Sequence, residues 1–153
     1  MSLGPVVSSS SPLIALERIG RLELIHELLG EVTIPVAVAR EVFGAEDPPM
    51  WVKVVELGSL GVDVPSSTLG AGEREAIALA IELSARWLVL DDQPARRLAV
   101  SRGLSVTGTV GLLLAAKRSQ LIDAVAPLLD ALDEAGFRLS EAVRHAALHE
   151  AGE

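Results

Sequence analysis

The stretch Arg86-Trp87-Leu88-Val89-Leu90-Asp91-Asp92 predicts the most buried strand of the fold. Its apolar centre, residues 88–90, is a continuous hydrophobic run of the kind found in parallel sheets that are covered on both faces. The run ends abruptly at two adjacent aspartates. A helix is then expected over residues 94–102, because proline is favoured in a first helical turn and Gly103 supplies a stop. The stretch therefore predicts a strand that leads directly into a helix.

The same alternation of strand and helix extends over the rest of the chain. Parallel strands joined by helices require right-handed crossovers, so the pattern predicts an α/β fold with a parallel sheet of four to five strands flanked by helices. The other expected strands are residues 5–8, 31–34 and 104–106, with a further edge strand at 51–57. The other expected helices are residues 13–19, 21–29, 35–43, 72–84, 110–117, 123–135 and 140–150.

Two local features add detail to this pattern. Ser11 and Pro12 are expected to be the N-cap and first residue of the first helix, because serine caps well and proline tolerates the N1 position. Residues 57–69 are rich in Gly, Ser and Pro and are expected to be the most mobile segment.

The composition limits the classes of function. A chain of 153 residues that is 50% hydrophobic is one domain's worth of globular protein. Cysteine is absent, which excludes disulfide scaffolds and thiol chemistry. The net charge of -8 repels phosphate, so nucleic acid would require a local basic patch, a metal ion or a partner chain. No signal peptide or membrane-spanning run is recognised, so we expect a cytoplasmic protein without a membrane partner.

Acidic residues gather where a parallel sheet binds its ligands, beyond the carboxyl ends of the strands. Asp91 and Asp92 follow the buried strand, and two adjacent carboxylates there are suited to a cation. The alternative is that Asp92 only caps the next helix. Glu41 and Glu73 lie on helices, where a solvated side chain or, for Glu73, a favourable interaction with the helix dipole is the simpler interpretation.

Five sequence blocks, taken in order, resemble the PIN-domain nucleases, in particular a small prokaryotic branch related to toxin ribonucleases. The resemblance extends from Val6 to about Leu139, and it implies a PIN-like three-layer sandwich over residues 5–153, with 1–4 set aside as a vector-derived leader. The blocks are Val6-Val7-Ser8-Ser9-Ser10-Ser11-Pro12-Leu13-Ile14, Ile34-Pro35-Val36-Ala37-Val38-Ala39-Arg40-Glu41, Gly72-Glu73-Arg74-Glu75-Ala76-Ile77-Ala78-Leu79-Ala80, Leu90-Asp91-Asp92-Gln93-Pro94-Ala95-Arg96 and Thr107-Gly108-Thr109-Val110-Gly111-Leu112-Leu113.

The resemblance also implies a chemistry. Glu41, Glu73 and Asp91 match family acids that hold one or two Mg²⁺ or Mn²⁺ ions for RNA cleavage, with Asp92 as a helper. Hard cations of this kind prefer carboxylate oxygens. Ser9 departs from the family, which shows an aspartate there. Three interpretations stay open for Ser9: a non-cutting member, a reduced enzyme in which Ser9 binds metal through water, or a substitution introduced to make a toxic protein expressible.

Other polar residues carry weaker signals than these acids. Arg96 and Thr107 are candidate contacts for a substrate phosphate, and Lys117-Arg118 would extend a basic patch, although ordinary surface charge is the favoured explanation of the cations. Thr109 is expected to bond the acids or to cap the next helix. His145 and His149 lack the glutamate of a zinc-protease motif and are expected to be solvated.

The sequence supports three functional hypotheses, the first two of which follow from the resemblance. The first is a PIN-like metal-dependent endoribonuclease, the toxin of a toxin–antitoxin pair, impaired at Ser9. The second is a non-catalytic PIN-like binding module, and the third is a small-molecule binder on a flavodoxin-like sheet. The expected partners are RNA, an antitoxin protein and a second copy of the chain as a homodimer.

Overall fold

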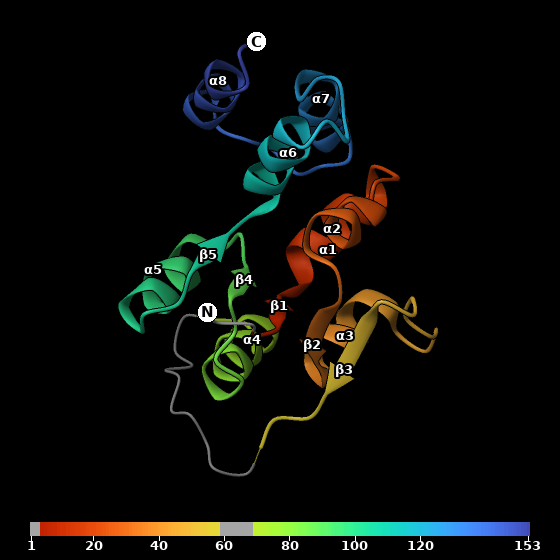
Figure 1. Cartoon of the computed structure of the whole chain (residues 1–153), viewed down its shortest axis with the longest axis vertical. Helices are drawn as coiled ribbons and strands as arrows, with labels where there is room; N and C mark the ends of the chain where they lie inside the picture. The colour runs from red at the N-terminus through yellow and green to blue at the C-terminus, as the bar shows by residue number, and fades with distance from the viewer. Residues whose placement is uncertain (1–3, 59–68) are drawn as a thin grey trace.

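A parallel sheet forms the centre of the computed structural model, which describes residues 4–58 and 69–153 (Figure 1). The strands are β1 (Val6–Ser8), β2 (Val32–Pro35), β3 (Val52–Val55), β4 (Trp87–Val89) and β5 (Val106–Thr107). Their order across the sheet is β3-β2-β1-β4-β5, and every neighbouring pair is parallel. The predicted α/β sandwich is confirmed, including the place of residues 52–55 at a sheet edge.

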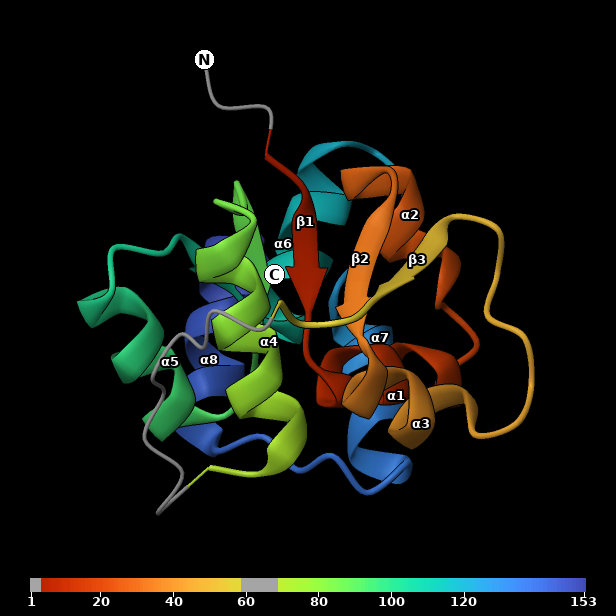
Figure 2. The same ribbon diagram turned by 90° about the horizontal axis from the view of Figure 1, so that it is seen from below.

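Helices follow each strand, as parallel connections require. Within the described residues these are α1 (Ser10–Arg18), α2 (Glu23–Leu29), α3 (Val36–Phe43), α4 (Ala71–Glu82), α5 (Gln93–Ser101), α6 (Thr109–Arg118), α7 (Ala126–Glu134) and α8 (Glu141–Glu150). Figure 2 shows the arrowheads of β1 and β2 pointing toward α1 and α3, which begin at the carboxyl edge of the sheet.

The two faces of the sheet bury different hydrophobic clusters because side chains alternate along a strand. Val6, Val32 and Val89 belong to the face covered by α1, α2, α6 and α7. Val7 and Leu88 belong to the opposite face, which is covered by α4 and α5. The result is the three-layer arrangement of helices, sheet and helices.

The stretch that predicted the buried strand behaves as expected except at Trp87, the first residue of β4. Leu88, Val89 and Leu90 are all fully buried, whereas Trp87 is 38% exposed. Leu90 lies beyond the end of β4, yet its N–H still donates to the carbonyl of Thr107 at 2.8 Å. The sheet therefore holds the chain in place up to the residue before Asp91.

The predicted N-cap of the first helix is wrong. Ser9, not Ser11, is the N-cap of α1, and its side chain does not bond the helix backbone. Pro12 falls two residues later than N1 but remains in the first turn, where a helix does not need the missing N–H. The helix therefore begins immediately after β1 and carries three consecutive serines, Ser9 to Ser11, along the carboxyl edge.

Several other boundaries differ by a few residues. Pro35 ends β2 in extended backbone, so α3 begins at Val36. Helices α2 and α7 begin two and three residues later than predicted, and β5 lies at 106–107 because its pairing with β4 ends at Thr107. Of the segment predicted to be mobile, residues 59–68 lie outside the described residues. In the part of the chain that is described, no helix has the length and apolar character needed to cross a membrane.

Candidate active site

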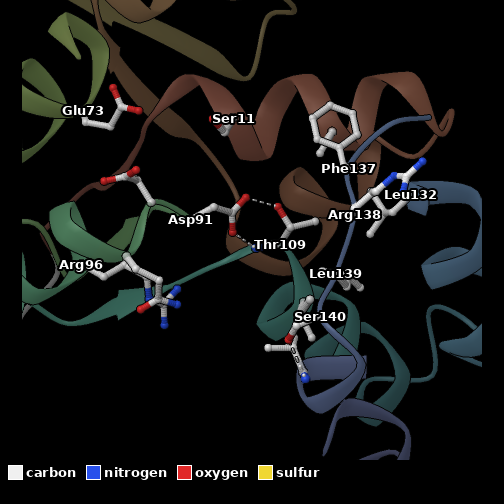
Figure 3. Close-up of a pocket in the computed structure, with 15 residues that line it drawn as sticks. Ser11, Glu73, Asp91, Arg96, Thr109, Leu132, Phe137, Arg138, Leu139 and Ser140 are labelled. Carbon is white, nitrogen blue, oxygen red and sulfur yellow. Dashed lines mark hydrogen bonds between the residues drawn. The ribbon is translucent and has the colours of Figure 1, made fainter. Parts of the chain in front are cut away.

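A cavity of about 550 Å³ opens at the carboxyl edge of the sheet. Three of the predicted acids, Glu73, Asp91 and Asp92, line it (Figure 3). They come from the start of α4 and from the link between β4 and α5, which are separate in the sequence. The fold therefore brings together acidic side chains that the sequence alone could place only at the ends of elements.

Asp91 is held in one orientation by Thr109. The N–H of Thr109 donates to Oδ1 of Asp91 at 2.8 Å, and its hydroxyl donates to Oδ2 at 2.6 Å. Thr109 is the first residue of α6 and is 5% exposed. The prediction that Thr109 bonds the acids is confirmed, whereas the N-cap of α6 is Gly108.

Gly108 allows this close approach. A Cβ atom at this position would lie 2.5 Å from Oδ1 of Asp91 and 2.7 Å from Nη1 of Arg96. Side chains do not approach a Cβ so closely, so any other residue would displace Asp91 or Arg96. The packing of the site, and not the backbone conformation, therefore requires glycine here, because any residue can adopt a φ of −126°.

Asp92 and Arg96 have structural roles beside their place in the cavity. Oδ2 of Asp92 accepts the N–H of Ala95 at 3.0 Å, so Asp92 is the N-cap of α5. Nη1 of Arg96 donates to the carbonyl of Leu90 at 2.9 Å. Capping uses one oxygen of Asp92, and the Leu90 contact uses one of the five N–H groups of Arg96, so both retain hydrogen-bonding capacity toward the cavity.

Ser9 lies at the end of β1 and is 2% exposed. Its N–H and its hydroxyl both donate a hydrogen bond to the carbonyl of Val89, at 2.9 and 3.2 Å. Because the hydroxyl donates to the neighbouring strand, it has a structural role. Ser9 is also absent from the residues that line the cavity.

The two predicted glutamates lie in different surroundings. Glu73 lines the cavity and folds back toward Gly70, where a Cβ atom would lie 2.6 Å from its Oε2. Glu41 does not line the cavity, and its carboxylate lies against Gly72, where a Cβ atom would be 2.4 Å from Oε1. The hydroxyl of Ser10 is close to the same point, buried and without a hydrogen-bond partner among the described residues.

The carboxylate groups of this site are suitable ligands for a divalent cation, but too few of them lie close together. Carboxylate oxygens are the ligands that Mg²⁺ and Mn²⁺ prefer. However, within residues 4–58 and 69–153 no three acidic or histidine side chains are close enough to hold a metal ion together. Position 9, immediately after the central strand β1, is a serine, so the chain has no carboxylate at this point of the sheet edge.

The remaining candidates are separated from this cavity. Thr107 lines a different cavity, beside Trp87 and Gly111. Lys117 binds Glu153 and the carbonyl of Ala151 near the C-terminus. His145 and His149 are exposed on α8, as predicted.

Sequence reasoning missed the opposite wall of the cavity. Phe137, Arg138 and Leu139, in the link between α7 and α8, face the same space as the acids. Nothing in a short link between two helices identifies it as part of a site. The available signal is indirect, namely a lone aromatic residue followed by arginine just before the start of α8.

The comparison with protein families gives a match along nearly the whole chain. The model of the DUF3368 family, a PIN domain, matches residues 5–153. The match includes every strand and helix described above. No curated protein and no solved structure gives a match.

Proposed function

We propose, from the premise that this chain belongs to the PIN-domain family, that it is a metal-dependent endoribonuclease whose activity is reduced by Ser9. The observation that carries the proposal is that Glu73, Asp91 and Asp92 line one cavity at the carboxyl edge of a parallel sheet. Ligands bind at this edge in open α/β sheets. In this proposal the protein is a cytoplasmic toxin, and its partners are RNA, an antitoxin and a second copy of the chain.

The residues have distinct roles in the proposal. Asp91 and Glu73 would hold Mg²⁺ or Mn²⁺, and the bound ion would polarise the phosphate and activate water. Thr109 keeps the Asp91 carboxylate oriented through two hydrogen bonds. Arg96 presents its remaining N–H groups to a phosphate oxygen, because guanidinium and phosphate match in geometry and charge.

The function has a second candidate, a PIN-domain binding module that does not cut. Two observations favour it: Ser9 carries no charge and bonds Val89, and no group of three possible metal ligands forms in the described residues. The two candidates differ in one measurable property, the response of the protein to a divalent cation when the missing carboxylate is restored.

The test is the variant Ser9→Asp. Position 9 is buried, so an aspartate there costs stability until a cation compensates its charge. We expect Ser9→Asp to melt below the wild type without metal and to recover with Mn²⁺, since a ligand that binds only the folded state stabilises it. We also expect RNA cleavage to rise at least about tenfold, because even outer-shell partners of metal ligands change affinity about 10- to 100-fold.

The control is a second substitution in the same background. Asp91→Asn added to Ser9→Asp is expected to abolish both the Mn²⁺ stabilisation and the cleavage. Asp123→Asn, at an exposed aspartate outside the cavity, is the charge-matched control and should leave both unchanged. Cleavage that persists in the Asp91→Asn double variant contradicts the proposal. Absence of any Mn²⁺ response in Ser9→Asp supports the binding module.

A further inference from the structure

The cavity at the carboxyl edge has two chemically different walls. Glu73, Asp91 and Asp92 form one, and the other comes largely from the link between α7 and α8 (Figure 3). Figure 3 shows Phe137 and Arg138 on the far side of Asp91 from Glu73. The apolar residues that complete this second wall are Val110, Leu132, Leu139 and Val143. A wall with an aromatic ring, aliphatic groups and arginine is not needed to hold a metal ion.

The second wall is fixed in place before any ligand arrives. The N–H of Phe137 donates to the carbonyl of Leu132 at 2.9 Å, and that of Leu139 donates to Oδ1 of Asp133 at 3.3 Å. Ser140 caps α8 through the N–H of Val143 at 3.1 Å. Pre-formed walls of this kind are typical of binding sites, because the ordering cost is met during folding.

The Phe137 ring already makes one cation–π contact. The guanidinium carbon of Arg18, on α1, lies 5.3 Å from the ring centroid. Phe137 is half-buried and lines the cavity, so part of the ring remains open to a ligand. Nucleobases stack on aromatic side chains and on arginine planes regardless of base identity.

Two arginines at the cavity have no carboxylate partner within the described residues. Neither Arg96 nor Arg138 forms an ion pair in that part of the chain. In a protein of net charge -8, cations outside any ion pair at a cavity provide the local attraction that an anion requires. The cavity therefore offers a stacking surface with one phosphate-binding group, Arg138, next to it and a second, Arg96, on the acidic side.

We propose that the link between α7 and α8 builds a nucleotide subsite for single-stranded RNA. One base stacks on Phe137 and the phosphate beside it pairs with Arg138, whereas Arg96, on the side of the acids, pairs with another phosphate of the same strand. The volume of about 550 Å³ lies within the range of about 300–1,000 Å³ that small-ligand sites occupy. This inference rests on the RNA substrate of the proposed function and does not depend on whether the chain cuts.

The test measures binding of a fluorescein-labelled single-stranded RNA decamer to the full chain in EDTA, so that cleavage does not contribute. Phe137→Leu keeps the residue apolar but removes the stacking face, and we expect about 5- to 100-fold weaker binding. Arg138→Gln, at an exposed position, removes one cation and should weaken binding and reduce its salt dependence. The second variant keeps the test valid if Phe137→Leu folds poorly.

The controls match each change. Trp87→Leu removes an exposed aromatic ring that lines another cavity, and Arg21→Gln removes an exposed arginine that lines a third. Both should bind within about twofold of the wild type. If both Phe137→Leu and Arg138→Gln bind RNA as tightly as the wild type, the subsite is overturned and the proposed function still stands. The second wall would then bind another ligand, such as a protein segment. A wild type that binds no RNA in EDTA also overturns the subsite, whereas the metal-dependent function is tested separately by Ser9→Asp with Mn²⁺.

Discussion

Two carboxylates in this molecule are held by similar hydrogen bonds but have different surroundings. Asp91 accepts the N–H and the hydroxyl of Thr109. Glu153 accepts the N–H groups of Val125 and Ala126, at 2.8 and 3.0 Å. Lys117 adds an ion pair to Glu153 at 2.9 Å, whereas Asp91 has no ion pair among the described residues.

The difference separates a carboxylate that forms an ion pair within the fold from one that does not. The backbone N–H groups of Val125 and Ala126, with Lys117 in addition, lower the pKa of Glu153 to about 2. Its charge is compensated, and it ties the C-terminus to the start of α7 and to α6. Asp91 is equally well oriented, but it forms no ion pair among the described residues and it lines a cavity. A fixed carboxylate outside any ion pair is available to bind an external cation or a donor.

The largest effect is expected at the partner of Asp91. Thr109→Val keeps the size and burial of residue 109 but removes the hydroxyl that donates to Oδ2 of Asp91. Hydrogen bonds to charged groups contribute about 1.5–3 kcal/mol to the free energy of unfolding, so the melting temperature should fall by roughly 3–12 °C. Differential scanning calorimetry checks this. Thr109→Ser, which retains the hydroxyl, should lie nearer the wild type, and equal melting of all three would show that the bond is dispensable.

A smaller effect, and one that depends on pH, is expected at Glu153. Since the folded-state pKa is lower than the ordinary 4.5, ionised Glu153 stabilises the fold above pH 4.5, and this contribution is lost as the pH falls toward 2. Glu153→Gln should therefore melt below the wild type at pH 7, and the difference should shrink between about pH 4.5 and 2. Melting curves from circular dichroism across this range test it. Glu150→Gln, an exposed neighbour, should show no such convergence, and a difference independent of pH would contradict the assignment.

The smallest effect is expected at Lys117. Lys117→Met removes the cation beside Glu153 but leaves both backbone donors, which are the larger causes of the lowered pKa. The pKa of Glu153 should rise by less than about one unit, because exposed ion pairs are weak, and stay below 4.5. Carboxyl-carbon NMR titration measures this directly. A return to 4.5 would mean that the lysine, not the backbone, sets the pKa.

The sequence predicted the architecture because hydrophobic runs and helix stops carry that information locally. The parallel sheet followed from strands separated by helices, and the place of Asp91 followed from the end of the run at 88–90. The orientation of Glu41 could not be predicted, because it depends on how α3 packs against Gly72 of α4. Phe137 gave no signal for a similar reason, since its link joins the site only through tertiary packing, which brings Phe137 against Arg18 of α1.

Glu153 also has surroundings that could not be predicted from the sequence. A glutamate at the end of a chain is ordinarily solvated, and its three contacts come from α6 and from the start of α7. The N-cap of α1 is a local error of another kind: Ser9, Ser10 and Ser11 are all suitable caps, and β1 ends early enough that the first of them is used.

The contact between Arg18 and Phe137 joins the first helix of the chain to one of its last links. When residues 1–135 of a nascent chain have left the ribosome and the rest is still inside it, Ser9, Glu73 and Asp91 are already exposed. Such a chain has only one side of the cavity. The acidic side is thus made early in synthesis and the side bearing Phe137 late. Under the proposed function, the cavity for RNA therefore stays incomplete while the chain is attached to the RNA-rich ribosome that makes it.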